Sequence, residues 1–219
     1  MVDGSVLLAS QAGTIEQAVA ILRTGGVVAF PTDTVYGLGA HSGMASAIEK
    51  LYQVKGREWQ KAIPLLIARI EDVTTIAVQV PEIAWRLAER FWPGPVTLVL
   101  PKAATVLDVL TGGANSVAVR IPAHAVALKL ISALGAPLAA TSANLSGQPE
   151  AVTAGEVQHA LGERVELILD GGCCPGGVPS TVVDVTTIPP IIRRRGALVS
   201  EVQAVLYTAG SSEQAAGSR

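Results

Sequence analysis

The chain has 219 residues, of which 49% are hydrophobic and 16% are charged. Its 16 Lys and Arg residues against 18 Asp and Glu residues give a formal net charge of −2, so its bulk charge gives no attraction toward nucleic acid or an anionic membrane. This composition excludes the disordered and fibrous classes, and the length is sufficient for one large domain or two small ones with a sizeable core.

Short runs of β-branched residues alternate with helical patterns along the whole chain. This layout predicts one α/β domain, in which helices pack on the faces of a sheet. The pattern predicts strands over residues 5–8, 27–30, 65–67, 96–100, 117–121, 137–140, 167–169, 181–185 and 191–193.

Helices are predicted over residues 45–54, 82–91, 125–134 and 201–207. Thr14 with Gln17, and Thr153 with Glu156, have the capping-box spacing that opens two further helices. Because small and polar residues dominate the end of the chain, we expect residues 208–219 to be a disordered tail after a domain over residues 1–207.

The N-terminal segment carries Asp3 and has no Lys or Arg before Arg23, which is not the pattern of a secretory signal. The least charged stretch, residues 131–148, is interrupted by Gly, Pro and Asn residues and is unsuited to a membrane span. The two cysteines, Cys173 and Cys174, are neighbours and offer no disulfide framework. We therefore expect a cytoplasmic protein with no membrane partner.

Four segments are more polar or more glycine-rich than a turn requires. In α/β sheets, ligands bind in loops at strand ends, so these segments are the candidate site. The plainer interpretation is that their Thr, Asp and Ser residues bond their own backbone, and that cations at a helix end complement its dipole. They are residues 31–39 (PTDTVYGLG), 55–61 (KGREWQK), 141–147 (TSANLSG) and 171–181 (GGCCPGGVPST).

Five cations suggest a pocket for a small anionic ligand: Lys55, Arg57, Lys61, Arg120 and Arg194. The structural alternative for Arg120 is an ion pair with Asp33 or Asp184. No residue is suited to be a covalent nucleophile, which favours nucleotide chemistry that depends on positioning and charge stabilisation.

Other chemistries lack their motifs. There is no phosphate-binding P-loop and no nucleophile elbow, and aromatic residues are too few for a platform that stacks single-stranded bases. His41, His124 and His159 are scattered, and the cysteines have no partners at zinc spacing. We expect no zinc, no haem and no resident metal ion.

Six motifs, in order along the chain, resemble the YrdC-like or TsaC-type threonylcarbamoyl-AMP synthases. They are PTDTVYGL (31–38), KGR (55–57), WPGPVT (92–97), VAVRIP (117–122), SANLSG (142–147) and PSTVVD (179–184). The resemblance implies an α/β fold in one domain: a twisted mixed sheet with helices on its faces and a concave basic cavity.

The resemblance also implies a nucleotidyltransferase that joins L-threonine, bicarbonate and ATP into L-threonylcarbamoyladenylate and pyrophosphate, with Mg²⁺ assisting. A separate threonylcarbamoyl transferase complex would then modify an adenosine of certain tRNAs. Carried over by position, Lys55 and Arg57 would be catalytic and would bind ATP together with Lys61, Ser116, Ser142, Asn144 and Arg194. L-threonine would be bound by Thr34, Arg120, Ala140 and Ser180.

The chain departs from the family pattern at two places. Many relatives have Pro after the KGR motif, where this chain has Glu58, and a histidine where this chain has Ala68. With 23 residues after Gly196, we expect the short form of the family. Two rivals stay open: a paralogue that binds double-stranded RNA or tRNA without synthesis, and a carbamoyl-adenylate enzyme, which is normally a longer chain with zinc motifs.

Overall fold

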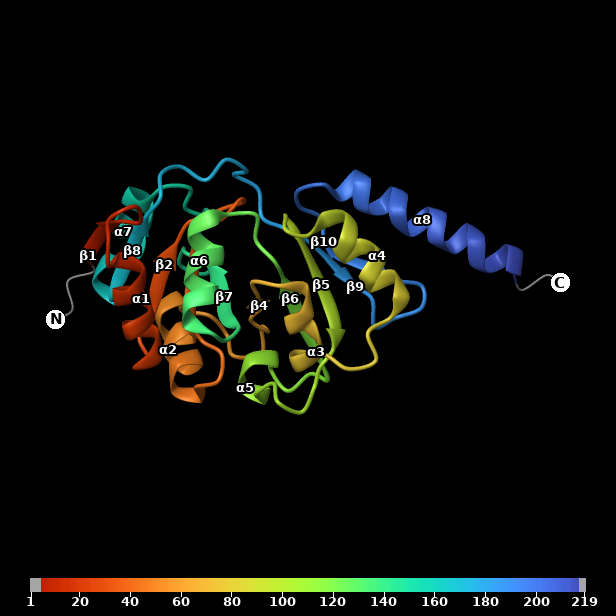
Figure 1. The fold of residues 1–219 in the computed structure, drawn as a ribbon, viewed down its shortest axis with the longest axis horizontal. Coiled ribbons are helices and arrows are strands. Elements are labelled where there is room, and N and C mark those ends of the chain that lie inside the picture. Colours follow the sequence, from red (N-terminus) through yellow and green to blue (C-terminus); the bar gives the residue numbers. More distant parts are fainter. Residues whose placement is uncertain (1–4, 217–219) are drawn as a thin grey trace.

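Ten strands form one mixed sheet in the computed structural model, which describes residues 5–216 and the side chains of residues 5–207 (Figure 1). Their order across the sheet is β1-β8-β2-β3-β7-β4-β6-β5-β9-β10. The strands are β1 (Ser5–Leu8), β2 (Val28–Phe30), β3 (Gly37–His41), β4 (Leu65–Leu66), β5 (Val96–Pro101), β6 (Ser116–Arg120), β7 (Leu138–Ser142), β8 (Leu167–Asp170), β9 (Thr181–Asp184) and β10 (Ile191–Arg194).

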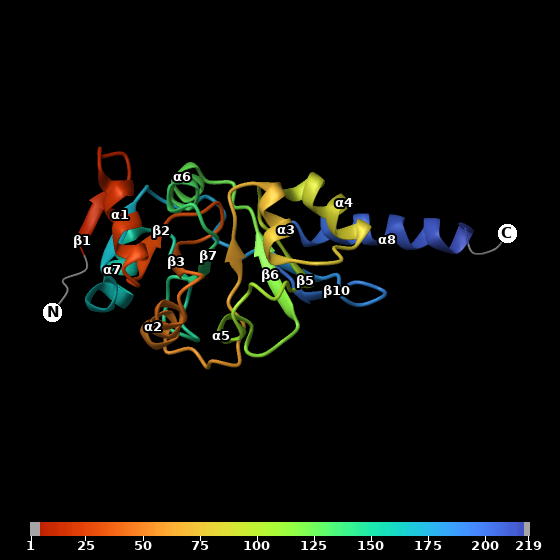
Figure 2. The same ribbon diagram turned by 60° about the horizontal axis from the view of Figure 1, so that its bottom comes forward.

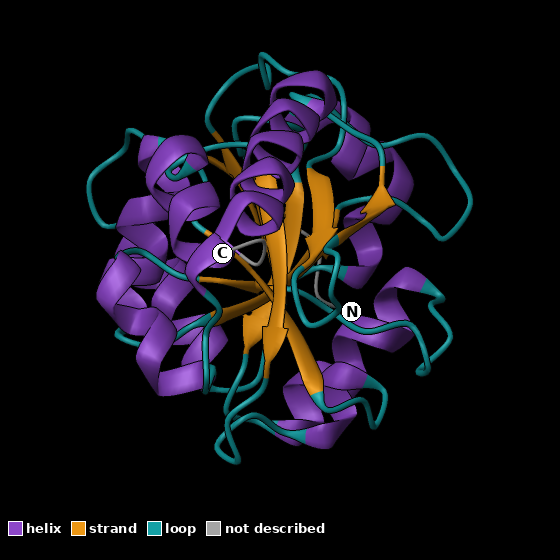
Figure 3. Cartoon of the chain, turned by 90° about the vertical axis from the view of Figure 1, so that its right-hand side faces the viewer, coloured by secondary structure: helices purple, strands orange, loops and turns teal. Residues whose placement is uncertain are grey.

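The sheet is mixed. The parallel pairs are β1 with β8, β2 with β8, β4 with β6 and β5 with β9, and the antiparallel pairs are β2 with β3, β3 with β7, β4 with β7, β5 with β6 and β9 with β10. Figure 3 shows the strands fanning out with helices on either side. The helices are α1 (Thr14–Arg23), α2 (Ala45–Lys55), α3 (Val73–Ile76), α4 (Glu82–Phe91), α5 (Asp108–Thr111), α6 (Ala125–Leu134), α7 (Ala154–Leu161) and α8 (Val199–Ala216), with 3-10 turns at Ile70–Asp72 and Gly162–Arg164.

The core consists of two hydrophobic clusters, one on each face of the sheet. Successive side chains of a strand point to opposite faces, so Val28 and Phe30 of β2 belong to the smaller cluster and Ala29 to the larger one. Figure 2 shows α6 and α2 on opposite sides of β3 and β7. Among the described helices, α1 and α6 contribute to the smaller cluster, and α2, α3, α4, α5, α7 and α8 contribute to the larger one.

The smaller cluster covers only half of its face. It includes residues of β2, β4, β7 and β8, and within the described part of the chain none from β5, β6 or β9. Thr97, Ala118 and Val182 lie on this face, because their strand neighbours Leu98, Val119 and Val183 belong to the larger cluster. No described helix is packed on this half of the face, which leaves it open to a ligand.

Most predicted elements are present with ends shifted by a few residues, but β3 was not predicted. The polar segment 31–39 ends within β3, whose residues Gly37 and Gly39 give no strand signal. The structure explains these glycines: an added Cβ would lie 2.9 Å from Phe30 Cζ at Gly37, and 2.8 Å from Phe30 Cε1 at Gly39. The Phe30 ring fills the space above β3, so side chains are excluded there.

One of the two predicted capping boxes is wrong. Thr14 is the first residue of α1, and the N-cap is Gly13, which has no side chain to bond the backbone. The other capping box is confirmed, because the Thr153 Oγ1 accepts from Glu156 N at 3.3 Å and the Glu156 carboxylate accepts from Thr153 N at 3.2 Å. The capping-box spacing therefore predicted the presence of both helices, but it did not predict the N-cap residue of α1.

The C-terminal helix differs from the prediction. Helix α8 lies beside α4 and continues to Ala216, through most of the segment expected to be disordered (Figure 1). The prediction for residues 217–219 falls outside the described residues. The division into a domain over residues 1–207 and a tail stays a prediction.

We expect Gly39→Ala to lower the free energy of unfolding by about 1–3 kcal/mol, because the new Cβ overpacks the core against Phe30 and Leu138. Gly155→Ala is the matched control, since Gly155 lies in α7 with no atom within 4 Å of an added Cβ. There the better helix propensity of Ala should stabilise the protein by about 0.5–1 kcal/mol. Urea denaturation measures both variants, and equal stabilities would contradict the packing argument.

Candidate active site

A cavity of about 400 Å³ occupies the half of the sheet face that none of the described helices covers. Its floor comes from alternate residues of adjacent strands: Leu66 of β4, Ala118 of β6, Val99 of β5 and Val182 of β9. The segment between β2 and β3 and the segment before β9 form its walls. The cavity therefore lies where the loops at the strand ends converge.

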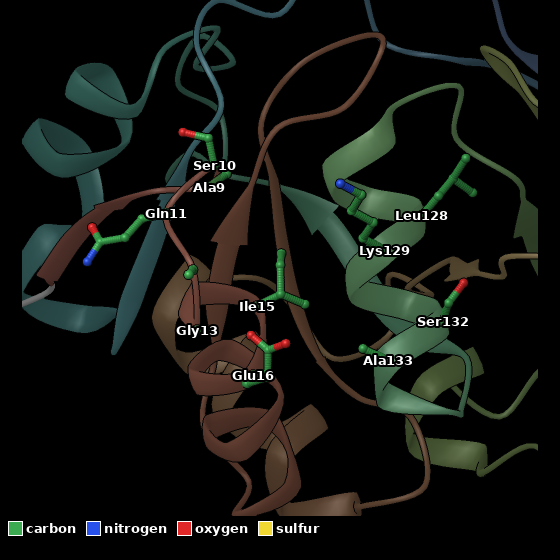
Figure 4. Close-up of a pocket in the computed structure, with 11 residues that line it drawn as sticks. Ala9, Ser10, Gln11, Gly13, Ile15, Glu16, Leu128, Lys129, Ser132 and Ala133 are labelled. Carbon is green, nitrogen blue, oxygen red and sulfur yellow. The ribbon is translucent and has the colours of Figure 1, made fainter.

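A second cavity, of about 720 Å³, lies between the turn after β1, α1 and α6 (Figure 4). Its polar lining includes Glu16 and Lys129, which have opposite charges, and none of the residues predicted for a site. Because it gathers no set of like-charged or convergent polar groups, we assign the ligand site to the smaller cavity on the open sheet face.

The cavity on the sheet face brings together residues that are up to 162 positions apart in the sequence, from Thr32 to Arg194. Of the predicted site residues, seven line it: Thr34, Arg57, Arg120, Ala140, Ser142, Ser180 and Arg194. Four predicted residues are not among its lining residues: Lys55, Lys61, Ser116 and Asn144.

Arg120 is buried at the end of β6, and each of its three nitrogens has a partner. Nε donates to Gly94 O at 2.9 Å, Nη1 to Thr34 Oγ1 at 3.1 Å and Nη2 to Asp33 Oδ1 at 2.6 Å. Burial lowers the pKa of Arg120 and the Asp33 carboxylate opposes that shift, so the guanidinium stays charged. The ion pair with Asp33 that the sequence offered as an alternative is thus present, and it coexists with exposure of Arg120 to the cavity.

Lys55 is turned away from the cavity toward the backbone of β7 and the loop after it. Its Nζ lies 2.6 Å from Ser142 O, 3.2 Å from Ser142 Oγ, 3.1 Å from Asn144 O and 2.8 Å from Asn144 Oδ1. Burial, with a smaller contribution from Arg57, lowers the pKa of Lys55 to about 8, so the amine is still protonated at pH 7. Three N–H donors facing four oxygens make Lys55 a clamp on residues 142–144.

Asn144 is committed to the protein at both ends of its amide. Its Oδ1 accepts from Lys55, and its Nδ2 donates to Gln148 O at 2.6 Å. Ser142 keeps its place in the cavity wall. Lys55 and Asn144 are bonded to each other, and Lys55 is bonded to Ser142, which lines the cavity. The two residues therefore hold the cavity wall in place.

Arg57 closes the loop that follows α2. Its Nε donates to Lys61 O at 2.9 Å and its Nη2 to Ala62 O at 2.8 Å, while the guanidinium lines the cavity. The Lys61 side chain is mostly exposed and lies 3.3 Å from Glu58 Oε2. Of these two predicted cations, the structure places Arg57 at the cavity and Lys61 in solvent.

Ser116 begins β6, and with Ala118 and Arg120 it occupies the face that carries the cavity. It lies two residues before Ala118 in β6 and pairs with Pro101 of β5. A ligand that fills the cavity and extends along β6 would reach this serine at the rim.

Arg194, at the end of β10, is bonded to Ser180. Its Nε donates to Ser180 O at 3.0 Å and its Nη2 to Ser180 Oγ at 2.9 Å. Partial burial lowers the pKa of Arg194, the Glu150 carboxylate opposes that shift, and the charge of Arg57 adds to it. Arg57 and Arg194 both line the cavity. The described lining residues include four arginines and no Asp or Glu. Arg120 and Arg193 are paired with Asp33 and Asp184, so Arg57 and Arg194 are the lining cations left for an anion.

Sequence reasoning missed several lining residues: Thr32, Tyr36, Thr97 and Arg193. Thr97 belongs to the WPGPVT motif and Thr32 to PTDTVYGL, but neither motif indicates which of its members faces a ligand. The period-2 alternation of β5 gives the only signal for Thr97, since Val96 and Leu98 read as core.

The glycine-rich segment 171–177 packs against the segment between β2 and β3. Gly177 N donates to Thr34 O at 2.8 Å, and an added Cβ at Gly176 would lie 2.6 Å from Asp33 O. The glycines are thus required for close contact between the two backbones. Cys174 is buried here, burial raises its pKa to about 11, and neither Cys173 nor Cys174 forms a disulfide.

Among the described residues, no helix combines the length and the hydrophobicity that a membrane span requires. The part of the chain that the structure describes contains no group of three or more His, Cys, Asp or Glu residues placed to hold a metal ion.

The known proteins that this chain resembles belong to one family. The Sua5/YciO/YrdC family model, described as telomere recombination, matches residues 20–196. The chain is 46% identical over 193 residues to threonylcarbamoyl-AMP synthase of Pyrococcus abyssi, which covers 88% of this chain and 57% of that protein. It is 37% identical over 196 residues to a putative threonylcarbamoyl-AMP synthase of Mycobacterium leprae, and this match covers 88% of this chain and 89% of that protein. The chain thus spans little more than half of the first relative.

Two solved structures have the same fold. P. abyssi Sua5 complexed with L-threonine is 46% identical with a TM-score of 0.85, over 87% of this chain and 56% of that one. Escherichia coli YciO is 29% identical with a TM-score of 0.80, over 89% of this chain and 96% of that one. The twisted mixed sheet expected from the sequence is thereby confirmed.

We expect Lys55→Met to lower the free energy of unfolding by roughly 2–4 kcal/mol, because it removes the donor from buried oxygens of Ser142 and Asn144. Lys61→Met is the matched control from the same segment. Its ion pair with Glu58 is exposed, so the change should be below about 0.5 kcal/mol. Urea denaturation at pH 7 measures both variants. Equal effects would show that Lys55 is not a structural clamp.

Proposed function

We propose that this chain, which belongs to the Sua5/YciO/YrdC family, forms L-threonylcarbamoyladenylate and pyrophosphate from L-threonine, bicarbonate and ATP. The observation that carries the proposal is that residues expected for the amino acid and residues expected for the nucleotide line one cavity. Relatives named threonylcarbamoyl-AMP synthase, and the L-threonine complex of a relative, support it.

The amino acid would occupy the end of the cavity at Arg120. A guanidinium is a natural partner for a carboxylate, and Arg120 keeps one N–H on each Nη after its bonds to Gly94, Thr34 and Asp33 are formed. Ala140 of β7 lies at the same cavity floor and would bring its backbone near the substrate.

ATP would place its phosphates at Arg57 and Arg194, with Ser142 beside them. The amine of threonine attacks bicarbonate, and loss of water gives a carbamate. A carbamate oxygen then attacks the α-phosphorus, and the bond to the β-phosphate oxygen breaks to release pyrophosphate. Arg57 and Arg194 would neutralise the charge that develops on the phosphate oxygens, in a site that is largely preorganised by the bonds of both guanidinium groups to the backbone.

Mg²⁺ would enter with the nucleotide. Because the described lining residues include no Asp or Glu, the phosphates would supply its anionic ligands and the chain could add only hydroxyl and carbonyl oxygens. When bound, Mg²⁺ would screen the phosphate charge.

The product has an activated carbonyl group and must be consumed by a group transfer. We propose that a separate threonylcarbamoyl transferase moves it to an adenosine of tRNA, and that the reaction takes place in the cytoplasm. Direct binding of tRNA or double-stranded RNA by this chain would mark the rival function.

The reaction is tested by pyrophosphate release from ATP in the presence of Mg²⁺ and bicarbonate, with and without L-threonine. We expect release to depend on threonine, the adenylate to be detected by mass spectrometry, and Arg57→Ala to lose at least about 100-fold in rate because transition-state charge is left unpaired. If the folded protein releases no pyrophosphate with threonine, the proposal fails. Salt-dependent binding of double-stranded RNA would then support the rival.

Two neighbouring arginines separate the contribution of the nucleotide site from that of surface charge. Arg194→Ala should raise the KM for ATP about tenfold or more, since it removes a cation that lines the cavity and is held there by its bonds to Ser180. Arg195→Ala should leave the KM within about twofold, because Arg195 is exposed and contacts Gln203 at 3.4 Å. Equal KM values for the two variants would contradict the placement of ATP.

A further inference from the structure

One cavity hydroxyl, Ser180, has partners that fix the direction of its hydrogen bonds. A hydroxyl has one proton to donate and two lone pairs that accept. Once the protein has taken two of these three capacities, the third determines whether a ligand must donate or accept. For Ser180 this depends on Thr97, a neighbour that the sequence did not indicate.

Ser180 is surrounded by donors. Its Oγ accepts from Arg194 Nη2 at 2.9 Å, and a guanidinium can only donate. Its Oγ also lies 2.8 Å from Thr97 Oγ1, which is 2% exposed and has Ser180 as its one recorded partner among the described residues. If Ser180 donated in this pair, the Thr97 proton would have no acceptor among the described residues, and a side chain that is 2% exposed gives a ligand little access to it. Thr97 is therefore the donor.

With Thr97 as the donor, the only hydrogen-bonding capacity that Ser180 Oγ keeps for a ligand is its own proton. Both lone pairs of its Oγ are taken by Arg194 and Thr97, and the cavity is the only direction left for the O–H. Ser180 is thus a donor to the ligand, next to the free N–H groups of Arg120.

Thr34 has no such assignment. The Thr32 hydroxyl donates to Val35 O at 2.6 Å, and its Oγ1 accepts from Thr34 N at 3.1 Å and from Val35 N at 3.3 Å, so all three of its capacities are used. Thr34 Oγ1 lies 3.0 Å from Thr32 Oγ1 and accepts from Arg120 Nη1 at 3.1 Å. The direction of the hydrogen bond to a ligand is therefore fixed at Ser180 and not at Thr34.

We propose that Thr97 is a positioning residue, which makes Ser180 a hydrogen-bond donor toward the amino-acid substrate. The inference rests on the proposed function. Arg120 and Ser180 together present donors to a carboxylate.

Thr97 allows a matched pair of variants. Thr97→Val keeps the shape and removes the hydroxyl, whereas Thr97→Ser keeps the hydroxyl and removes a methyl group. We expect Thr97→Val to raise the KM for L-threonine about fivefold to tenfold, with the KM for ATP within about twofold, and Thr97→Ser to remain within about twofold of wild type for both. Calorimetry of L-threonine without ATP should show the same loss of affinity for Thr97→Val.

A double-mutant cycle tests that the effect passes through Ser180. In the background of Ser180→Ala, Thr97→Val should cause no further rise in the KM for L-threonine. Equal effects of Thr97→Val and Thr97→Ser, no effect of Thr97→Val, or additive effects in the cycle would each overturn the proposal. If Thr97→Val does not fold, Thr97→Cys takes its place, since a thiol of similar size is a weaker donor.

Failure of the proposed function gives a different result. In that case the wild-type protein itself shows no threonine-dependent release of pyrophosphate. If the wild type is active and Thr97→Val behaves as wild type, only the positioning role fails.

Discussion

The buried charge of Arg120 is the constraint on which the site depends. A guanidinium that is 7% exposed is tolerated only when its N–H groups have acceptors, and here those acceptors come from separate parts of the chain. Gly94 lies before β5, whereas Asp33 and Thr34 lie between β2 and β3. By collecting these partners, Arg120 ties the two halves of the sheet together at the place where the cavity opens.

The rest of the site follows from how the helices are distributed. Helices α1 and α6 pack on β2, β7 and β8, and beyond β4 the same face has no helix among the described elements. A strand face without a helix would ordinarily expose apolar residues to water. Here that face carries Val99, Ala118 and Val182 as an apolar floor together with Thr97, Arg120 and Ser180, so a cavity with placed polar groups replaces a packed layer.

Much of this arrangement could be predicted from the sequence, and the exceptions have physical causes. Alternating apolar runs predicted nearly every strand, but β3 escaped because the Phe30 ring requires glycines where a strand normally has β-branched residues. The KGR motif predicted two cations at the ligand, but a motif does not say which way a side chain turns. The position of the expected histidine is Ala68, which packs beside the smaller core cluster and does not line the cavity.

The different directions of Lys55 and Arg57 reflect the chemistry of the two cations. An ammonium is a compact charge that can be enclosed by oxygens from every side, and Lys55 uses this to hold the carbonyls of Ser142 and Asn144. A guanidinium is planar, so Arg57 can bond Lys61 and Ala62 along one edge and still present its remaining N–H groups to the cavity. If the two residues were exchanged, a planar guanidinium would have to fit among the oxygens that enclose the Lys55 ammonium. A lysine in place of Arg57 would present one charged nitrogen to the cavity instead of several N–H groups in a plane. The order of the motif therefore determines which cation builds the site and which one meets the ligand.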